Sequence, residues 1–391
     1  MKFAFVKMLA KRALNIAPSA TLAIDAKAKQ LKKNGEDIVV FGAGQPDFST
    51  PDNIKQAAIK AINDNFTGYT PSGGIIELKQ AVAAKLKRDN NLTYDPSEIL
   101  ISCGGKHTLH NIMQVLLNKG DKVILPTPYW VSYEEQIKLA EAKPIFVKTD
   151  KKFKITADKI AEKINKKTKL IILTSPSNPT GAVIDEEELV KIADLAIKNN
   201  IYVISDEVYE FFIYDGKKQF SIASLNDQIK ALTITVNAVS KTYSMTGWRI
   251  GYCAGPKEII NAMDNLQSHT TSNPTSIAQK AALEALNGPQ DSVKIMVDEF
   301  DKRRKYMTER LNQIKGISCS LPEGAFYCFP DISKTKLGSI DFSNRLLDEA
   351  KVAVVPGIAF GSDKHARLSY ATSMDDIKKG MDRIEEFCNK L

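Results

Sequence analysis

Short apolar runs, rich in β-branched residues, alternate along the chain with stretches in which apolar residues recur every three or four positions. The apolar runs predict buried strands at residues 123–125, 170–173, 201–205, 233–237 and 250–254. The intervals predict helices, for example over residues 187–197. Strands that alternate with helices predict an α/β fold, with a mainly parallel sheet between helices. In such sheets ligands bind beyond the carboxyl ends of the strands, so the residues that follow each strand are the first candidates for a site.

The pattern changes toward the C-terminus. A long charged helix is predicted over residues 299–313, and short strands follow at residues 324–329, 352–355 and 366–370. This mixture predicts a smaller α+β domain, and we expect a helix at residues 20–33 to pack with it. A chain of 391 residues is longer than one hydrophobic core commonly serves. We therefore predict a large domain over residues 45–295 and a discontinuous small domain over residues 1–44 and 296–391.

Composition limits the class of protein. Apolar residues make up 43% of the chain and charged residues 26%, which is the balance of an ordinary globular protein. No apolar run reaches the length that crosses a bilayer, and lysines interrupt the N-terminus before a signal peptide can form. The five cysteines are scattered and lack metal-ligand spacing. They predict reduced thiols in a cytoplasmic protein that has no metal site.

The net charge of +8 raises the question of a nucleic-acid partner. The lysines stand singly along helical patterns, as in residues 52–63 and 186–199, and no basic block or basic–aromatic interleaving occurs. Such charges are typical of a solvated surface, so we expect no nucleic-acid or membrane partner. A modest positive field also helps to attract anionic substrates.

Lys241 is the first residue whose neighbours indicate chemistry. It follows an apolar strand and Ser240, and Arg249 stands eight positions later in the sequence Gly-Trp-Arg-Ile-Gly. A lysine that forms an imine must be partly desolvated and near another cation, because both lower its pKa. A phosphate-bearing aldehyde also needs a fixed cation and a hydroxyl, which Arg249 and Ser240 can supply. Taken alone, Lys241 is weak support, since most lysines are solvated surface groups.

Two other predicted strands end in polar residues. Asp206 follows the run 201–205 with Tyr209 three positions beyond, and Asn178 follows the run 170–173 in the sequence Asn-Pro-Thr-Gly. A carboxylate there can keep a pyridine nitrogen protonated, and the protonated ring is an electron sink for a carbanion. Tyr209 can hydrogen-bond the phenolic oxygen of such a ring, and Asn178 offers both a donor and an acceptor. The structural alternatives are that Asp206 caps a turn and that Asn178 belongs to an ordinary turn.

Candidate anion sites come from two further segments. Gly104 and Gly105 precede a helical pattern, where exposed backbone N–H groups can bind phosphate. The segment is not a Walker A loop, because the Gly-Lys-Ser/Thr ending is missing, and Pro46 disrupts any dinucleotide fingerprint near the N-terminus. Arg367, in a predicted strand, is a candidate fork for a substrate carboxylate, although a structural ion pair is the commoner role of one arginine.

Together and in this order, the motifs resemble the fold-type I, class I aminotransferases, which depend on pyridoxal-5′-phosphate (PLP). The likeness runs from about residue 18 to the C-terminus. The subgroup that the chain resembles is the bacterial aspartate aminotransferases, through Thr-Pro-Tyr-Trp at residues 127–130, Gly-Gly-Lys at 104–106 and Arg-Leu-Ser-Tyr-Ala-Thr-Ser at 367–373. The resemblance implies a seven-stranded, mainly parallel sheet and a homodimer with shared active sites.

The resemblance also implies roles toward the cofactor. Lys241 would carry PLP as a Schiff base and move the proton between the substrate Cα and C4′ of the cofactor. Asp206 would pair with the pyridinium nitrogen, and Tyr209 and Asn178 would contact the phenolic oxygen. Trp130 would lie against the ring, although its structural alternative is an ordinary core aromatic. The phosphate would be held by Ser240, Arg249, Gly104, Gly105 and Lys106, with Tyr69 reaching the phosphate of the partner subunit's site.

Roles toward the substrate follow in the same way. Arg367 would bind the α-carboxylate, backed by Gly44, Trp130 and Asn178. Lys106 would bind the distal carboxylate, with Ser19 and Thr21 nearby. The chain departs from the subgroup at Gln45, where Glu is common, and at Ala17, where relatives that also accept prephenate have a basic residue.

The leading hypothesis is reversible transfer of an amino group between L-aspartate and 2-oxoglutarate. Alternatives on the same scaffold are an aromatic, alanine or prephenate aminotransferase and a PLP-dependent β-lyase. The fold does not decide among them, whereas Lys106 favours a dicarboxylate. A different class is a regulator that uses a PLP fold as an effector-binding module. That class would need an appended DNA-binding domain, which we do not expect in the short segment before the enzyme-like region.

Overall fold

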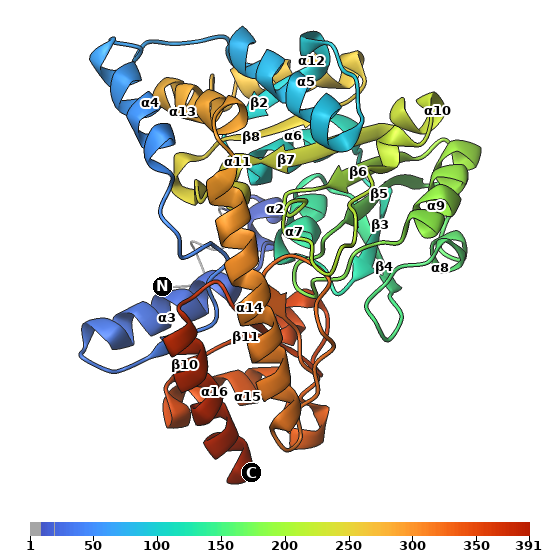
Figure 1. Ribbon diagram of the computed structural model, residues 1–391. Coiled ribbons are helices and arrows are strands. Elements are labelled where there is room, and N and C mark those ends of the chain that lie inside the picture. The colour runs from blue at the N-terminus through green and yellow to red at the C-terminus, as the bar shows by residue number, and fades with distance from the viewer. Residues whose placement is uncertain (1–8, 19) are drawn as a thin grey trace.

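The computed structural model describes residues 9–18 and 20–391, and a seven-stranded sheet forms its centre (Figure 1). The strands in spatial order are β2 (Ile99–Ser102), β8 (Gly251–Ala254), β7 (Thr233–Ala238), β6 (Tyr202–Asp206), β5 (Thr168–Thr174), β3 (Lys122–Thr127) and β4 (Lys143–Lys148). The pairs among β7, β6, β5, β3 and β4 are parallel, and both pairings of β8 are antiparallel. The predicted α/β fold with a mainly parallel sheet is confirmed.

Helices cover both faces of the sheet because successive side chains of a strand point to opposite faces. In β5, Leu170 and Ile172 pack on one face with α6 (Gly105–Leu116), α7 (Val131–Leu139) and α12 (Lys257–Ser268). Ile171 and Leu173 pack on the other face with α8 (Ala157–Ala161) and α9 (Glu186–Asn199). The remaining helices around the sheet are α4 (Asp52–Asn63), α5 (Ile76–Asn90), α10 (Asp227–Lys230), α11 (Val239–Thr242) and α13 (Ser276–Asn287).

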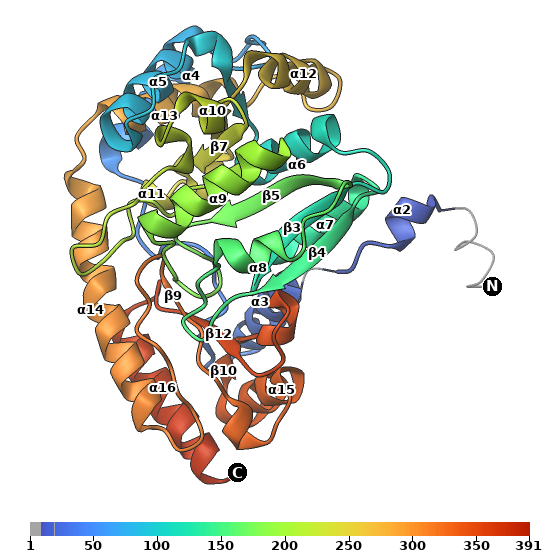
Figure 2. The ribbon, with the colours of Figure 1, turned by 90° about the vertical axis from the view of Figure 1, so that its right-hand side faces the viewer.

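A second part of the molecule joins the two ends of the chain. Figures 1 and 2 show α3 (Ala20–Lys33) beside the C-terminal elements, and its Ala28 packs with Leu347 and Ala353. Strand β1 (Val39–Val40) pairs with β10 (Val352–Ala353). A separate sheet has the order β11 (Val355–Pro356), β12 (Ala366–Ser369), β9 (Tyr327–Cys328), and it is antiparallel. The helices α15 (Ser339–Ala350) and α16 (Met374–Asn389) complete this part, and the short α2 (Lys11–Leu14) precedes α3.

Helix α14 (Asp291–Gln313) connects the two parts. It begins eight residues before the predicted helix, because Val293 and Met296 continue the buried face on which Phe300 and Met307 lie. Val293 packs with residues of the central sheet, whereas Phe300 and Met307 pack in the core of the second part. A boundary at residues 295 and 296 therefore falls inside one helix, and the division into two domains stays a prediction.

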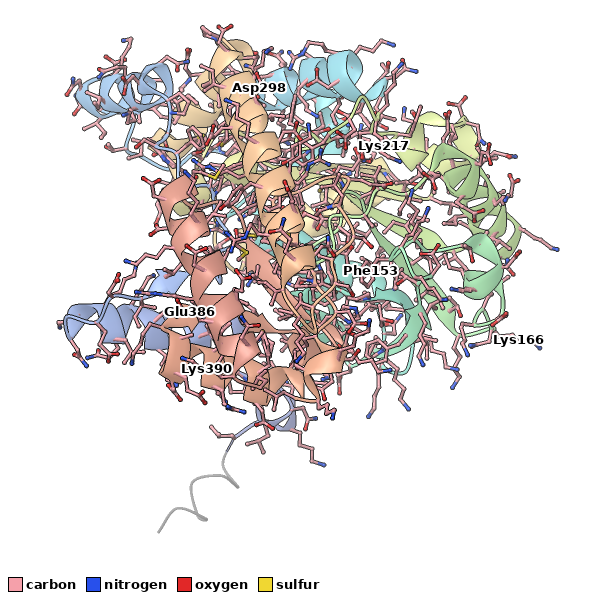
Figure 3. The ribbon with its side chains drawn as sticks, turned by 60° about the horizontal axis from the view of Figure 1, so that its bottom comes forward. Phe153, Lys166, Lys217, Asp298, Glu386 and Lys390 are labelled. Carbon is pink, nitrogen blue, oxygen red and sulfur yellow. The ribbon has the colours of Figure 1, made fainter. Side chains whose placement is uncertain are left out.

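Charged side chains surround the core. Figure 3 labels Lys166, Lys217, Asp298, Glu386 and Lys390, which are all exposed. Within residues 9–18 and 20–391, no helix is long and apolar enough to cross a membrane, and no group of His, Cys, Asp and Glu could hold a metal ion.

Candidate active site

Most of the predicted site residues gather at one edge of the central sheet. Strands β2, β3, β5, β6 and β7 all end at this edge, and after or at their ends stand Gly104, Trp130, Asn178, Asp206 and Ser240. The reversed strand β8 begins at the same edge. Its first residue, Gly251, lies opposite both Ser102 and Ala238. Arg249, two residues before it, is thereby brought beside the ends of β2 and β7, which accounts for its eight-residue spacing from Lys241.

Lys241 lies on α11, and its Nζ donates a hydrogen bond to the carbonyl oxygen of Gly44 at 2.6 Å. The pKa of Lys241 is lowered to about 8, mainly by burial. The positive charges of Arg249, Arg367 and Lys106 contribute to this lowering, and the negative charge of Asp206 opposes it. An amine with this pKa is partly unprotonated near neutral pH, as a lysine that attacks an aldehyde must be.

Asp206 is 5% exposed, at the end of β6. The Tyr133 hydroxyl donates to its Oδ2 at 2.5 Å and is itself hydrogen-bonded to Thr174 at 2.8 Å. The backbone N–H of Val208 donates to Oδ1 at 3.3 Å. Burial raises the pKa of Asp206, while these hydrogen bonds and the charge of Lys241 lower it. No ion pair joins Asp206 to a cation among the described residues, so this buried carboxylate is suited to a cationic group of a ligand.

Arg367 is 2% exposed on β12, and it faces the same edge from the second part of the molecule. Its Nη1 donates to Asn178 Oδ1 and its Nη2 to the carbonyl oxygen of Gly42, both at 2.9 Å. The guanidinium lies over the rings of Tyr327, at 4.4 Å, and Phe360, at 5.0 Å. Its Nε has no hydrogen-bond partner within the described chain. Because a buried unpaired donor is costly, this N–H is suited to an anionic ligand.

Tyr209 lies between these two charged groups. Its hydroxyl is hydrogen-bonded to that of Tyr327 at 2.8 Å. Burial raises the pKa of Tyr209, as does the neighbouring Tyr327, while Arg367 lowers it. Both phenols are therefore neutral near pH 7. One hydroxyl donates to the other, and the accepting hydroxyl can donate its own proton to an oxygen of a ligand.

Glycines allow a close approach at the start of α6. Gly104 has φ +89°, and a Cβ there would lie 2.2 Å from Nη2 of Arg249. A Cβ at Gly251 would lie 2.2 Å from the backbone nitrogen of Gly105. The Arg249 guanidinium, which donates to the Thr246 carbonyl oxygen at 2.9 Å, therefore lies directly against the N-terminus of this 12-residue helix. A cation beside free backbone N–H groups is a site for phosphate.

Lys106 and Trp130 form another side of the site. The Lys106 ammonium lies 5.0 Å from the centre of the Trp130 ring, and the Trp130 ring packs edge-on against Tyr133. Desolvation lowers the pKa of Lys106, and Arg249 lowers it further. Ser240 is buried on α11, next to Lys241.

Three predicted residues are not placed in this cluster. Tyr69 is 93% exposed, and it borders a surface hollow of about 220 Å³ together with Thr70, Ser72, Ser268, Ser272 and Asn273. Ser19 lies outside the described residues, and of Thr21 only the backbone, in α3, is described.

The structure also brings in residues that the sequence analysis missed. Tyr133 donates a hydrogen bond to Asp206, and Thr174 is hydrogen-bonded to Tyr133. Tyr327 is hydrogen-bonded to Tyr209, and the ring of Phe360 lies against the Arg367 guanidinium. Tyr133 stands three positions after Trp130 in a helical pattern, which is a signal that could have indicated a shared face. Tyr327 and Phe360 offer no comparable signal, because only the tertiary fold brings them to the sheet edge.

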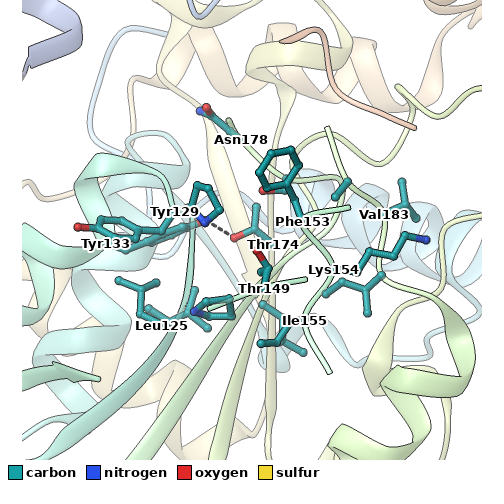
Figure 4. Close-up of a pocket in the computed structure, with 17 residues that line it drawn as sticks. Leu125, Tyr129, Tyr133, Thr149, Phe153, Lys154, Ile155, Thr174, Asn178 and Val183 are labelled. Carbon is teal, nitrogen blue, oxygen red and sulfur yellow. Dashed lines mark hydrogen bonds between the residues drawn. The ribbon is translucent and has the colours of Figure 1, made fainter. Parts of the chain in front are cut away.

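A small cavity lies beside the site, next to Tyr133 and Thr174 (Figure 4). Tyr133, Thr174 and Asn178 are among its lining residues, and its volume is about 30 Å³. One water needs roughly 10–15 Å³, so the cavity holds about two waters and is too small for a substrate. The chemistry therefore belongs to the cluster around Lys241.

A desolvated lysine, a buried carboxylate and a phosphate site at one sheet edge define the class of PLP-dependent enzymes with this α/β fold. The family model for aminotransferases of class I and II matches residues 36–384, and the chain belongs to this family. It is 50% identical over 388 residues to the aspartate aminotransferase of Bacillus sp., which covers 97% of this chain and 99% of that protein. It is 48% identical to a probable aspartate/prephenate aminotransferase of Rickettsia felis, covering 99% of this chain and 98% of that one. The structure of the Thermus thermophilus aspartate aminotransferase with maleate superimposes with a TM-score of 0.94 at 40% identity, over 97% of this chain and 99% of that one.

The enzyme is a PLP-dependent aminotransferase. The residues present fit this cofactor in three respects. Lys241 is a desolvated amine that would suit its aldehyde, Asp206 is a buried carboxylate that would suit its ring nitrogen, and Arg249 lies against glycine backbone where its phosphate would fit.

Proposed function

We propose that this chain is an aspartate aminotransferase, which transfers the amino group reversibly between L-aspartate and 2-oxoglutarate. The proposal rests on one observation: two separate cations border the site, Arg367 beside Asn178 and Lys106 over the Trp130 ring, and both lower the pKa of Lys241. A dicarboxylate needs two cations, because a second carboxylate is costly to bury unpaired. Relatives support this choice, since the Bacillus protein is named an aspartate aminotransferase and the Thermus protein was solved with maleate, a dicarboxylate.

The proposed roles toward the cofactor follow from the contacts. PLP supplies an aldehyde that joins amines and a ring that accepts electrons from the Cα of an amino acid. Asp206 holds the proton at the ring nitrogen, and Lys241 removes and returns the proton at Cα. Tyr209 and Asn178 donate to the phenolic oxygen. The phosphate is held by Ser240, Arg249 and the backbone of Gly104, Gly105 and Lys106.

The proposed substrate contacts use the second part of the molecule. Arg367 binds the α-carboxylate with its fork, and Asn178, already hydrogen-bonded to it, keeps the guanidinium in position. Gly44 and Trp130 border this site. Lys106 binds the distal carboxylate, and its place over the Trp130 ring keeps the ammonium beside the site.

We also propose that the active species is a two-fold symmetric homodimer in the cytoplasm. The exposure of Tyr69 supports the dimer, since a tyrosine at a surface hollow can reach a partner's phosphate site. The five unpaired cysteines support a reducing compartment.

Replacement of Lys106 by Ala tests the choice of substrate. Lys106 is exposed in the structure, and a bound substrate carboxylate would bury the pair. Removing one partner of a buried charge pair costs about 2–5 kcal/mol, or roughly 30-fold to several-thousand-fold. We expect Lys106→Ala to lower kcat/KM for aspartate by about 30-fold or more, while kcat/KM for alanine and phenylalanine changes little. A matched control is Lys169→Ala, because Lys169 also lies over a ring, that of Tyr202, at 5.3 Å. An equal loss on every amino donor would contradict the dicarboxylate assignment.

Prephenate is the amino acceptor that tests the breadth of the specificity. Ala17 brings no charge to the position where prephenate-accepting relatives have a basic residue, and its backbone N–H donates to Glu135 at 3.0 Å. We therefore propose that prephenate is a poor acceptor. Turnover of prephenate comparable with that of 2-oxoglutarate would contradict this narrower specificity.

A further inference from the structure

The turn after β6 has two faces. Asp206 and Tyr209 lie on the face toward the site, whereas Glu207 and Glu210 point the other way, toward α5. Glu207 is fully buried, and it accepts hydrogen bonds from Ser205 at 2.7 Å and Ser221 at 2.6 Å.

Glu210 is the centre of a buried network of charged and amide groups. Lys85, on α5 and 1% exposed, donates to its Oε1 and forms an ion pair with it. Asn90 donates to Oε2 at 2.7 Å, and it also donates to Glu207 at 2.9 Å. Lys85 in turn donates to Asn90 Oδ1 at 2.6 Å. A buried ion pair of this kind persists only because its remaining donors and acceptors are satisfied.

Asn237 connects this network to the lysine. Its Nδ2 donates to Oε1 of Glu210, and its Oδ1 accepts the backbone N–H of Ala238 at 2.7 Å. Asn237 is buried near the end of β7, and α11 with Lys241 begins two residues later. The Glu210 carboxylate is thus hydrogen-bonded to Asn237, in the segment that leads into α11 and Lys241. Glu210 itself belongs to the same segment as Asp206 and Tyr209.

We propose that Glu210, paired with Lys85, is a positioning residue that sets the place of Lys241 relative to Asp206 through Asn237. It touches neither substrate nor cofactor. The inference rests on the proposed roles of Lys241 and Asp206. A displacement of about 1 Å at a reacting group can cost roughly 100-fold in rate, so a rigid link between the two segments matters for catalysis.

Two variants of the holoenzyme separate this role from simple stability. Asn237→Ala cuts the link to Ala238 and leaves the pair of Lys85 and Glu210 intact. Glu210→Gln removes the charge and turns an amide NH₂ toward Asn90, which is itself a donor there. The control is Asp301→Asn, which removes one of the two carboxylates, Asp301 and Asp215, that pair with the fully buried Arg304 on α14, away from the site.

Four quantities are measured on each variant: the thermal unfolding midpoint, kcat for aspartate, KM for aspartate, and the midpoint of the pH titration of the absorbance of the bound cofactor. The absorbance titration reports whether Nζ of Lys241, when joined to the cofactor, is protonated. Its midpoint therefore responds to the distances from Nζ to Asp206 and to Arg249. We expect Asn237→Ala and Glu210→Gln to shift the titration midpoint by about 0.5 pH unit or more. We also expect kcat to fall about 10- to 100-fold with a smaller change in KM.

Asp301→Asn is expected to lower the unfolding midpoint but to leave the titration and kcat at wild-type values. If the two network variants behave as this control does, the network is only structural and the inference is wrong. If Glu210→Gln does not fold, Asn237→Ala decides alone. Failure of the wild-type enzyme to use aspartate would refute the proposed substrate, while the absorbance titration would still test the positioning role.

Discussion

The hydroxyl of Tyr133 is predicted to keep Asp206 ionised. Within the described chain, Asp206 accepts two hydrogen bonds. The one from the Tyr133 hydroxyl is the shorter, at 2.5 Å, and the one from the Val208 N–H is 3.3 Å long. In Tyr133→Phe the ring stays in place and only the donor is lost. Burial already raises the pKa of Asp206, and loss of the donor raises it further.

The size of the effect follows from the strength of a hydrogen bond to a charged group. Such a bond contributes about 1.5–3 kcal/mol, which corresponds to a pKa rise of about 1–2 units. The proposed role of Asp206 requires the ionised form. The acid limb of the kcat/KM profile for aspartate is therefore expected to move to higher pH by about the same 1–2 units. On the acid side, kcat/KM falls roughly 10- to 100-fold, and it recovers as the pH rises.

The assay is steady-state kinetics with aspartate and 2-oxoglutarate across the pH range in which the protein stays folded. Tyr129→Phe is the matched control, because Tyr129 is similarly buried and also donates to a carboxylate, that of Glu134, away from Asp206. Its acid limb is expected to coincide with that of the wild type. A Tyr133→Phe profile that also coincides with the wild type would refute the assignment of the Tyr133 hydroxyl to Asp206.

Three other outcomes are expected. Lys241→Ala should lose the covalent attachment of the cofactor, and its turnover should fall by more than about 10²–10⁴-fold. The attachment is checked by mass spectrometry after borohydride reduction, and a cofactor found on another lysine would contradict the assignment of Lys241. Arg367→Lys loses the fork that reaches Asn178, so kcat/KM for aspartate should fall about 30-fold or more in steady-state assays, and a wild-type value would remove Arg367 from the site. Burial raises the pKa of Glu207 to about 7, so the stability that its protonated form contributes is full below about pH 4.5 and is lost as the pH rises through 7. Urea unfolding should therefore find Glu207→Gln more stable than the wild type at pH 9, by up to about 3 kcal/mol, and little changed at pH 5; equal curves at both pH values would contradict the buried, raised pKa.

The strands that the sequence analysis missed show where local pattern stops being informative. Strands β2 and β4 are the two edges of the central sheet. The apolar run of β2 is only three residues long, and β4 contains Pro144 between a lysine and three apolar residues. Neither segment has a strong period of its own, and each becomes a strand because a neighbour, β8 or β3, supplies its hydrogen bonds.

Helix α14 shows a related limit. The predicted helix begins at the charged segment from residue 299 onward, whereas the observed helix begins at Asp291 and its first two turns contain Val293, Ile295, Met296 and Val297. They are helical because Val293 packs on the residues around the central sheet, a contact that no local pattern contains.

The contacts within the site divide in the same way. The residues that follow each strand could be predicted, because the parallel arrangement alone brings the ends of β5, β6 and β7 to one edge. Their partners could not. Tyr133 is 73 positions from Asp206, and Gly42 is 325 positions from Arg367.

The sequence by itself determined the alternation of strands and helices, the residue types at the strand ends and the family resemblance, because all three depend on local order along the chain. The tertiary structure alone decided which groups meet: the reversed β8 that brings Arg249 to the N-terminus of α6, the second part that brings Arg367 over Asn178, and the burial that lowers the pKa of Lys241. The physical reason is that a pKa and a hydrogen bond depend on distance and on solvent access. Both are set by segments that are remote in sequence and close only after folding.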